Sequence, residues 1–273
     1  RDGETERTRE GEVGGHPVGV PMVDVETVGA GGGSVAWVDG GGALRVGPES
    51  AGAEPGPACY GQGGERPTVT DASLLLGYLG ADTTLGEDLE LRKEPATAAF
   101  ERLLPDTDLG DPVAVARGVY RVATERMARA VRKVTVREGH DPRGFAVVAF
   151  GGAGPMHATA LAERLDVRSV RVPRANGVLS ALGLLAAPLR HDASRTIREP
   201  LDGIDAEAVE GRYERLREQI HERMETTREI ETTRKADLRY AGQSHELTVE
   251  VGEPFSPVRA AERFHAAHER ARG

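Results

Sequence analysis

Residues 145–172 read FAVVAFGGAGPMHATALAERLDVRSVRV, and this stretch decides the fold class. It opens with the apolar run Phe145–Phe150, which is typical of a strand buried on both faces of a parallel sheet. Gly151–Gly154 supplies a glycine-rich turn, Pro155 favours the start of a helix, and Ser169–Val172 has the character of a second strand. Strand, turn, helix and strand within about 30 residues match the size of one right-handed βαβ crossover. The sequence therefore predicts an α/β protein with a parallel sheet.

The helix that precedes this unit is the clearest of the remaining elements. Residues 111–139 begin with Asp111 at the N-cap position and Pro112 at the first helical position, both of which favour a helix start. Apolar side chains then recur every three or four residues, which is the pattern of an amphipathic helix. Residues 94–104 also predict a helix. The small, apolar segment Gly177–Ala187 is expected to form a helix buried against the sheet.

The N-terminal part is rich in glycine and in short β-type runs. Three strands are expected, with glycine turns between them: Val18–Val28, Ser34–Val38 and Ala43–Gly47. The glycine- and proline-rich residues 48–70 then predict a long irregular loop, and loops of that length are usually functional or disordered. Asp71 is expected to cap a short helix over Ala72–Leu79.

The C-terminal part has a different character. Residues 205–230 predict a helix dense in Arg and Glu, which we interpret as a solvated face. Asp237–Val251 carries strand signals, and the sequence ends soon afterwards within another helix. These changes predict two domains. Residues 1–190 would form the α/β domain, and residues 191–273 a linker helix and the beginning of a C-terminal α+β domain.

Composition excludes several classes of protein. The 273 residues carry 44 acidic and 35 basic side chains, a net charge of −9, which argues against binding to a nucleic-acid backbone. Aromatic residues make up only 4%, so the core must be built from Val, Leu and Ala. The single cysteine, Cys59, cannot form an internal disulfide, and no apolar run approaches the roughly 20 residues of a membrane span. The composition thus predicts a cytoplasmic globular protein without a membrane segment.

The glycine run Gly29–Gly33 is a candidate anion contact. It lacks the third glycine or alanine of a dinucleotide-binding fingerprint, because Ser34 stands there and a strand follows instead of a helix. The sequence also contains no Gly-Lys-Ser/Thr phosphate loop. Backbone N–H groups without Cβ atoms beside them can still approach an anion closely. The alternative is a plain turn between two strands.

The turn Gly151–Gly154 is more informative. Glycines at a strand-to-helix junction let a flat ring or a phosphate approach the backbone, and the helix N-terminus supplies positive potential. His157 stands where a dinucleotide fold would place its last glycine, which points to nucleotide contact of another kind. The alternative is that these glycines only permit close packing of the helix on the strand.

Metal ligands give weaker signals. Cys59, Asp71, His140 and His157 could contribute to a metal site, but no pair has the spacing of a known ligand motif. Two interpretations stay open for Cys59, which lies among prolines and glycines. It is either a small buried apolar side chain or a thiolate that binds zinc together with Asp71 or His157.

Five segments carry a resemblance to a known family: TVGAGGGSVAWVD (27–39), GPESAGAEPGPACYGQGGERPTVTDA (47–72), AFGGAGPMHA (149–158), VPRANGVLSALGLL (172–185) and LRYAGQSHELTV (238–249). They resemble, in the same order, the hydantoinase A/5-oxoprolinase family. That family contains ATP-dependent N-methylhydantoinases, 5-oxoprolinases and the related subunits of acetone and acetophenone carboxylases. The resemblance implies an actin/Hsp70-like ATPase fold, in which two lobes built on ribonuclease H-like sheets enclose the nucleotide. This chain would be half of that core with an inserted glycine-rich β region.

The resemblance also implies which residues form the site. The motif that contacts adenosine would comprise four residues, Gly151, Gly152, Ala153 and Gly154. The residues near the phosphates or the substrate would be Gly31, Gly32, Gly33 and Ser34. Asp71 is the candidate catalytic residue, and the candidate metal ligands are Cys59, Asp71 and His157.

The reaction implied by the resemblance is the ATP-driven opening of a cyclic amide. ATP, with Mg²⁺, would phosphorylate the amide oxygen of a small lactam or imide, and the ring C–N bond would then be hydrolysed. A hydantoinase B-type subunit or domain is the expected partner, in an oligomeric enzyme. Zinc is a further candidate cofactor.

The sequence departs from the family in one respect that bears on activity. Its two acidic glycine–threonine phosphate loops, of the DxGGTFTD and GGTSTD types, do not occur here. The chain is therefore expected to correspond to the second half of the ATPase core plus the start of the C-terminal domain, and to be inactive by itself. Two alternatives stay open: a non-catalytic remnant or nucleotide-binding module, and a subunit of an ATP-dependent ketone carboxylase. No motif identifies the substrate.

Overall fold

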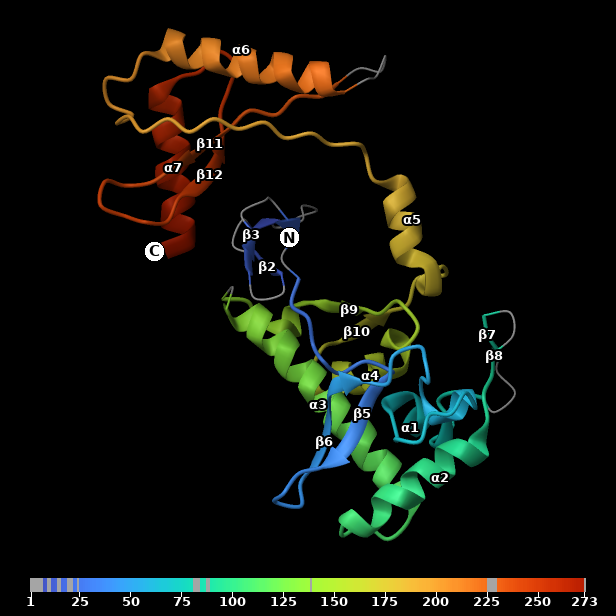
Figure 1. Ribbon diagram of the computed structural model, residues 1–273. Coiled ribbons are helices and arrows are strands. Elements are labelled where there is room, and N and C mark those ends of the chain that lie inside the picture. Colours follow the sequence, from blue (N-terminus) through green and yellow to red (C-terminus); the bar gives the residue numbers. More distant parts are fainter. Residues whose placement is uncertain are drawn as a thin grey trace. The chain divides into compact units, whose positions relative to one another are not determined.

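The computed structural model describes residues 7–8, 11–13, 16–18, 22–23, 25–80, 84–86, 89–137, 139–224 and 230–272. The chain divides into two compact units, unit 1 over Arg1–Ala186 and unit 2 over Ala187–Gly273 (Figure 1). Each unit has a hydrophobic core of its own. No helix in the described parts of the chain combines the length and the apolar composition that a membrane span requires.

A long helix, α3 (Pro112–Arg137), organises unit 1. The antiparallel hairpin of β5 (Ser34–Val38) and β6 (Leu44–Ser50) packs along it, as do the helices α1 (Val69–Leu75) and α2 (Lys93–Leu103) (Figure 1). Small aliphatic side chains dominate the core between them, as the low aromatic content predicts. Its buried members are Ala36, Val46, Val69, Ala72, Phe100, Leu103, Val115, Ala116, Val119 and Ala123.

The two helices expected ahead of the βαβ unit are confirmed. α3 begins where Asp111 and Pro112 predict, and Asp111 Oδ1 accepts a 2.7 Å hydrogen bond from the amide of Ala114. The apolar stripe faces the core, since Val115 and Val119 are fully buried. The segment predicted over 94–104 is α2.

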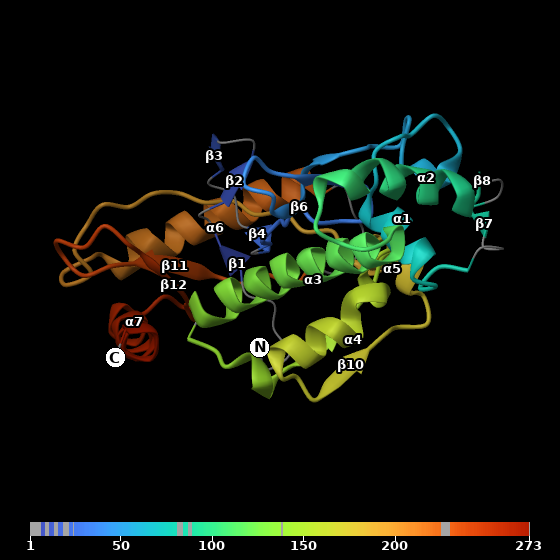
Figure 2. The same ribbon diagram turned by 90° about the horizontal axis from the view of Figure 1, so that it is seen from below.

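The predicted βαβ unit is confirmed in its topology. β9 (Ala146–Val148) pairs in parallel with β10 (Ser169–Arg171) (Figure 1). α4 (Gly154–Leu165) connects the two strands and packs on α3 (Figure 2). The expectation that the first strand is buried on both faces is wrong. Its large apolar side chains are about half exposed: Phe145, Val148 and Phe150. The reason is that only two strands form this sheet among the described residues, so these side chains have no further strand or layer to pack against.

The apolar segment after β10 forms the predicted helix but not the predicted contact. A short 3-10 turn (Asn176–Val178) leads into α5 (Leu179–Ala186). None of the residues of α5 is buried, and Leu184 and Leu185 are 80% and 85% exposed. The helix contacts little of unit 1 beyond the turn that precedes it, so an apolar surface faces solvent.

The other strands of unit 1 are short antiparallel pairs. They are β1 (Arg7–Thr8) with β4 (Met22–Val23), β2 (Gly11–Val13) with β3 (His16–Val18), and β7 (Thr84–Leu85) with β8 (Leu89–Glu90). The strand predicted over Val18–Val28 lies partly outside the described residues. Of those described, only Val18, Met22 and Val23 are in strands, whereas residues 25–28 have no regular structure.

The described part of unit 2 contains two helices and a hairpin. α6 (Ala206–Arg223) begins after the N-cap Asp205, and α7 (Pro257–Arg272) packs on the hairpin of β11 (Lys235–Leu238) and β12 (Leu247–Glu250). The strand signals of 237–251 therefore correspond to the end of β11 and to β12. The buried core consists of Val209, Val249, Val251, Phe255, Ala260 and Phe264.

Candidate functional site

The first glycine turn is held by its own serine. The Ser34 amide donates a 3.0 Å hydrogen bond to the carbonyl oxygen of Gly31, and the Gly31 amide donates a 2.9 Å bond to Ser34 Oγ. Ser34 is buried. These reciprocal bonds fix the loop conformation directly before β5, so the turn is ordered without any ligand.

The structure brings the two predicted glycine segments together. A Cβ atom built on Gly32 would lie 3.9 Å from Cβ of Ala153 and 2.7 Å from Thr70 Oγ1. The Thr70 amide also donates a 2.8 Å hydrogen bond to the Gly32 carbonyl oxygen. A side chain at position 32 would therefore force Thr70 Oγ1 of α1 to move, whereas Ala153 of the second glycine turn lies at an ordinary van der Waals distance. The two turns, far apart in sequence, therefore lie near each other in unit 1.

The second turn presents an open backbone surface. Gly151 has φ = 80°, and its amide donates a 2.7 Å hydrogen bond to the carbonyl oxygen of Asn176. A Cβ atom on Gly151 or on Gly152 would have no atom within 4 Å. Packing within unit 1 therefore does not explain glycine at position 152, whereas close approach of a ligand or of another segment would.

The start of α4 adds positive potential to this surface. Its N-cap residue is Ala153, which offers no side-chain cap, and Pro155 lies in its first turn. The backbone N–H groups of a first helical turn have no partner within the helix, so an uncapped start favours an anion. The turn over 151–154 thus combines an open backbone with a helix N-terminus.

Asp71 is not the N-cap residue that the sequence predicts. Its carboxylate instead accepts several hydrogen bonds that join a loop to α1. Thr68 is the N-cap of α1, which begins at Val69, and Asp71 completes a capping box with Thr68. The buried carboxylate accepts four hydrogen bonds, from the amides of Ala58 (3.2 Å), Cys59 (2.7 Å) and Thr68 (2.8 Å) and from the Thr68 hydroxyl (2.7 Å). Both oxygens are thus occupied by protein donors, and the carboxylate ties the loop 57–60 to α1.

Cys59 is fully buried between the long loop and α1. Burial, followed by the negative charge of Asp71 and a hydrogen bond to it, raises the pKa of the thiol far above its ordinary value. The side chain is therefore a neutral thiol at physiological pH. It packs in a small cluster with Leu74, Leu91 and Ala96.

His157 lies elsewhere in unit 1, on the inner face of α4. Its ring stacks on Tyr120 at 4.7 Å, and Nδ1 lies 3.1 Å from Thr124 Oγ1. The Thr124 hydroxyl donates to the Tyr120 carbonyl oxygen at 2.8 Å, so Nδ1 of His157 carries the proton and donates to Thr124. Nε2 of this fully buried ring has no hydrogen-bond partner among the described residues. Burial lowers the pKa of His157.

The structure therefore does not bring the three predicted metal ligands together. Cys59 and Asp71 are adjacent, whereas His157 is held by Thr124 and Tyr120, and His140 lies beside Phe145 with the ring centroids 5.7 Å apart. This arrangement does not fit a zinc site. Among the described residues, one group of three acidic, histidine or cysteine side chains is close enough for a metal, and it lies in unit 2.

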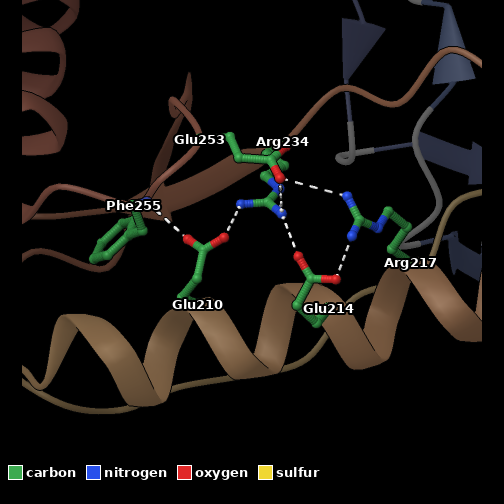
Figure 3. Close-up of polar contacts among 6 residues, drawn as sticks. All are labelled: Glu210, Glu214, Arg217, Arg234, Glu253 and Phe255. Atoms are coloured by element: carbon green, nitrogen blue, oxygen red, sulfur yellow. Dashed lines mark hydrogen bonds and ion pairs between the residues drawn. The ribbon is translucent and has the colours of Figure 1, made fainter.

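That group is Glu210, Glu214 and Glu253, and it surrounds a guanidinium (Figure 3). Arg234, which is 6% exposed, lies 2.6 Å from Glu210, 3.0 Å from Glu214 and 3.1 Å from Glu253. Glu210 also accepts a 2.8 Å hydrogen bond from the amide of Phe255. The hydrogen bonds from Arg234 and from this amide lower the pKa of Glu210. The guanidinium of Arg234 thus occupies the space between the three carboxylates that a metal ion would need. Because Glu210 and Glu214 belong to α6 and Glu253 follows β12, Arg234 acts as a clamp that holds α6 to the segment after β12.

Sequence patterns did not reveal this clamp. The interpretation of 205–230 as a solvated charged face overlooked that two of its glutamates turn toward the hairpin. Glu210 and Glu214 are four residues apart and share one face of α6, which is the signal that could have indicated a common partner.

Comparison with known proteins identifies the family of this chain. A family model described as hydantoinase/oxoprolinase matches residues 1–193, which include both glycine turns and the βαβ unit. The chain belongs to the hydantoinase/oxoprolinase family. The resemblance stated from the sequence motifs is thereby confirmed.

Relatives of this hydantoinase/oxoprolinase chain are longer than it is. An uncharacterized protein of Methanocaldococcus jannaschii is 45% identical over 93% of this chain and 37% of its own length. Caprolactamase subunit alpha of Pseudomonas jessenii is 36% identical over 98% of this chain and 40% of its own length. The chain thus spans about 40% of the length of these relatives.

Solved structures of family-related enzymes share the mixed α/β fold. The crystal structure of the ATP-dependent caprolactamase from Pseudomonas jessenii has a TM-score of 0.75 at 35% identity, over 96% of this chain and 40% of that one. A nucleotide-free structure of acetone carboxylase has a TM-score of 0.78 at 25% identity, over 99% of this chain and 41% of that one.

Proposed function

We propose that this chain is part of an ATP-dependent cyclic-amide hydrolase, and that it contributes half of an actin/Hsp70-like ATPase core. The observation that carries the proposal is the proximity of the two glycine turns, since a Cβ atom on Gly32 would lie 3.9 Å from Cβ of Ala153. Membership of a family that includes ATP-dependent cyclic-amide hydrolases, such as the caprolactamase, supports it. In this proposal residues 1–190 are the second half of that core, and residues 191–273 begin the C-terminal domain.

The two groups of site residues would contact different parts of the nucleotide. Gly151, Gly152, Ala153 and Gly154 would contact adenosine, because the backbone there is open on one side. Gly31, Gly32, Gly33 and Ser34 would face the phosphates or the substrate. The fit is good for a flat ring and for an anion, since the turn precedes an uncapped helix start.

The chemistry explains why such an enzyme needs ATP. The carbonyl carbon of an unstrained lactam or imide is a poor electrophile, and transfer of the γ-phosphoryl group of ATP to the amide oxygen, with release of ADP, would make that carbon more electrophilic. Water would then add to the carbon, the ring nitrogen would take up a proton and leave as the C–N bond breaks, and a second water would release phosphate from the resulting acyl phosphate. The residues of this chain would position the nucleotide rather than react with it. Mg²⁺ would accompany the phosphates. Asp71, the one acidic candidate, has both oxygens engaged by four protein donors, so we propose that carboxylates outside this chain hold the metal.

The partners follow from the relatives. Two of them are named as subunits, caprolactamase subunit alpha and the acetophenone carboxylase gamma subunit, which matches 61% of this chain at 40% identity. We therefore propose that this chain works with a hydantoinase B-type subunit or domain in an oligomeric, cytoplasmic enzyme that acts on a small cyclic amide.

A ketone carboxylase is the second candidate function. The observation that favours it is the acetone carboxylase structure, whose TM-score of 0.78 is as high as that of the caprolactamase. Assays of the intact enzyme with its B-type partner on 5-oxoproline, hydantoins, lactams and ketones distinguish the two. ATP-dependent ring opening supports the proposal, and ATP-dependent carboxylation of a ketone overturns it in favour of the carboxylase.

Nucleotide binding tests the site itself. Gly152→Val adds a branched side chain where the ring should approach, and we expect ADP affinity by calorimetry to fall at least about tenfold, or 1.4 kcal/mol. Gly110→Val is the matched control, because a Cβ atom there also meets nothing within 4 Å. Circular dichroism checks that both variants fold. Equal ADP affinity in the wild type and Gly152→Val would remove the adenosine assignment.

A further inference from the structure

A second pocket of unit 1 lies between the β5–β6 hairpin and α3, and the proposed nucleotide site does not use it. Its volume is about 730 Å³, and none of the residues 31–34 or 151–154 lines it. One wall is a face of α3 that carries Arg126, Arg129 and Lys133. These positions are three and four residues apart, so their side chains share one side of the helix.

The pocket is more positive than the chain around it. Four basic side chains line it against two acidic ones, in a chain whose net charge is −9. Two of the bases are paired within the pocket. Arg45 lies 2.7 Å from Asp39, and Lys133 lies 2.6 Å from Glu26.

Two arginines remain after this pairing. Arg126 donates a hydrogen bond to the carbonyl oxygen of Val46, and Arg129 Nε lies 3.4 Å from the carbonyl oxygen of Glu125 on its own helix. Neither guanidinium has a carboxylate partner among the described residues. Both arginines line the pocket and carry its positive charge that no carboxylate of the described residues neutralises. The planar guanidinium group is suited to binding an oxyanion through two parallel hydrogen bonds.

The opposite wall carries the single tryptophan of the protein. Trp37 lines the same pocket, and its Nε1 donates a 3.1 Å hydrogen bond to the carbonyl oxygen of Gly47. This bond fixes the edge of the indole, while the side chain stays 39% exposed. An oriented, partly exposed indole offers a flat apolar surface on which a ring can stack.

We propose that this pocket binds a ligand that joins an oxyanion to a flat ring: an aryl or heteroaryl phosphate or carboxylate. The oxyanion lies against Arg126 and Arg129, and the ring lies on Trp37. Glu26 and Asp39 stay paired with Lys133 and Arg45 and leave the two arginines to the ligand. Gly29, at the start of the glycine run, lines the pocket, but none of the residues 31–34 or 151–154 proposed for the nucleotide does, so the two sites differ in their contact residues.

Trp37 also provides the measurement, because it is the only tryptophan of the chain. The probes are phenyl phosphate and benzoate, titrated against tryptophan fluorescence, with inorganic phosphate and phenol as half-ligands. We expect a saturable change with at least one of the two probes, and each half-ligand at least tenfold weaker than the joined one. The two probes show whether phosphate or carboxylate is preferred.

Matched variants locate the binding. Arg129→Gln should weaken it at least fivefold, whereas Arg121→Gln, an exposed arginine of the same helix that does not line the pocket, should leave it unchanged. Gly152→Val should also leave it unchanged, which separates this pocket from the nucleotide site. The proposal is overturned if neither probe gives a saturable change, if a half-ligand binds as tightly as the joined probe, or if Arg129→Gln and Arg121→Gln bind equally well.

Discussion

The amide of Cys59 donates a 2.7 Å hydrogen bond to the carboxylate of Asp71, so a loop residue and a helix residue twelve positions apart share one buried charge. The sequence suggests both as candidates for chemistry. In the structure their shared role is to hold the loop 57–60 on α1. The first two predictions follow from this pair.

Replacement of Asp71 should destabilise unit 1. Asp71→Ala leaves four donors without an acceptor, three of them backbone amides, and hydrogen bonds to a charged group contribute about 1.5–3 kcal/mol each before relaxation. We expect the free energy of unfolding to fall by about 3 kcal/mol or more, measured by urea denaturation. Asp108→Ala, at an exposed position, is the control and should change it by less than about 0.5 kcal/mol. A similar small effect of Asp71→Ala would show that water replaces the carboxylate.

Cys59 should be unreactive in the folded chain. Burial and the Asp71 charge raise its pKa, and the thiolate is the reactive form, so alkylation by iodoacetamide should be at least about a hundredfold slower than in denaturant. The rate is measured by mass spectrometry. Elemental analysis of the wild type and of Cys59→Ser should find no zinc that depends on Cys59. Zinc present in the wild type and absent from the variant would establish the metal site instead.

His157 should make unit 1 sensitive to acid. Burial lowers its pKa, whereas an unfolded histidine titrates near about 6.5, so the unfolded state takes up the proton first as the pH falls. The contribution of the neutral ring to stability is therefore present above about pH 6.5 and is lost below it. The difference in free energy of unfolding between the wild type and His157→Gln should shrink from about pH 7.5 to about pH 5. His191→Gln, at an exposed position, should show no such trend. A pH-independent difference for His157→Gln would show that the buried ring does not titrate in this range.

Removal of Arg234 should destabilise unit 2. The guanidinium is almost fully buried and lies between three carboxylates that are 26%, 38% and 58% exposed, so solvent screens part of the repulsion left behind. We expect Arg234→Met to lower the stability of unit 2 by about 2 kcal/mol in thermal unfolding. Arg234→Lys should recover little, because one ammonium cannot reach three carboxylates. The control Arg239→Met removes one exposed pair at 3.7 Å and should have little effect. Full recovery by lysine would mean that only the charge matters.

The 273-residue chain by itself should not hydrolyse ATP. It has no acidic glycine–threonine loop, and the oxygens of Asp71 are already engaged, so nothing in the proposed site is left to hold Mg²⁺ at the phosphates. Release of phosphate should not exceed that of Gly152→Val purified in the same way. Activity in the wild type that is lost in this variant would show that the chain is a complete ATPase.

Local signals predicted much of the fold. Asp111 and Pro112 correctly predicted the start of α3. The apolar run Phe145–Phe150 and the glycines at 151–154 correctly predicted a strand followed by a turn. These predictions succeed because helix caps, apolar periodicity and glycine turns each depend on a few neighbouring residues of the sequence. Thr68 was missed as the cap of α1, although Thr68 and Asp71 have capping-box spacing.

Long-range features could not be predicted in the same way. The proximity of Gly32 and Ala153 depends on how α1 and the βαβ unit pack, and neither segment carries a signal for it. The clamp around Arg234 joins α6 to residues beyond the hairpin, so a pattern within α6 shows only half of it. Conversely, α5 is apolar enough to predict burial, but burial requires a partner surface that composition does not reveal.

The leucines of α5 have a practical consequence for every one of these measurements. Leu184 and Leu185 are at least 80% exposed and Leu182 is 49% exposed. The folded chain therefore already exposes apolar side chains to solvent, as a denatured protein does. The fluorescence of a solvatochromic dye such as ANS should therefore increase when the dye is added to the folded protein. In a thermal-shift assay that reports dye fluorescence, the initial signal would be high and its change on unfolding would be small. Melting curves of this protein are better followed by circular dichroism, which reports the backbone and does not depend on a dye that binds exposed leucines.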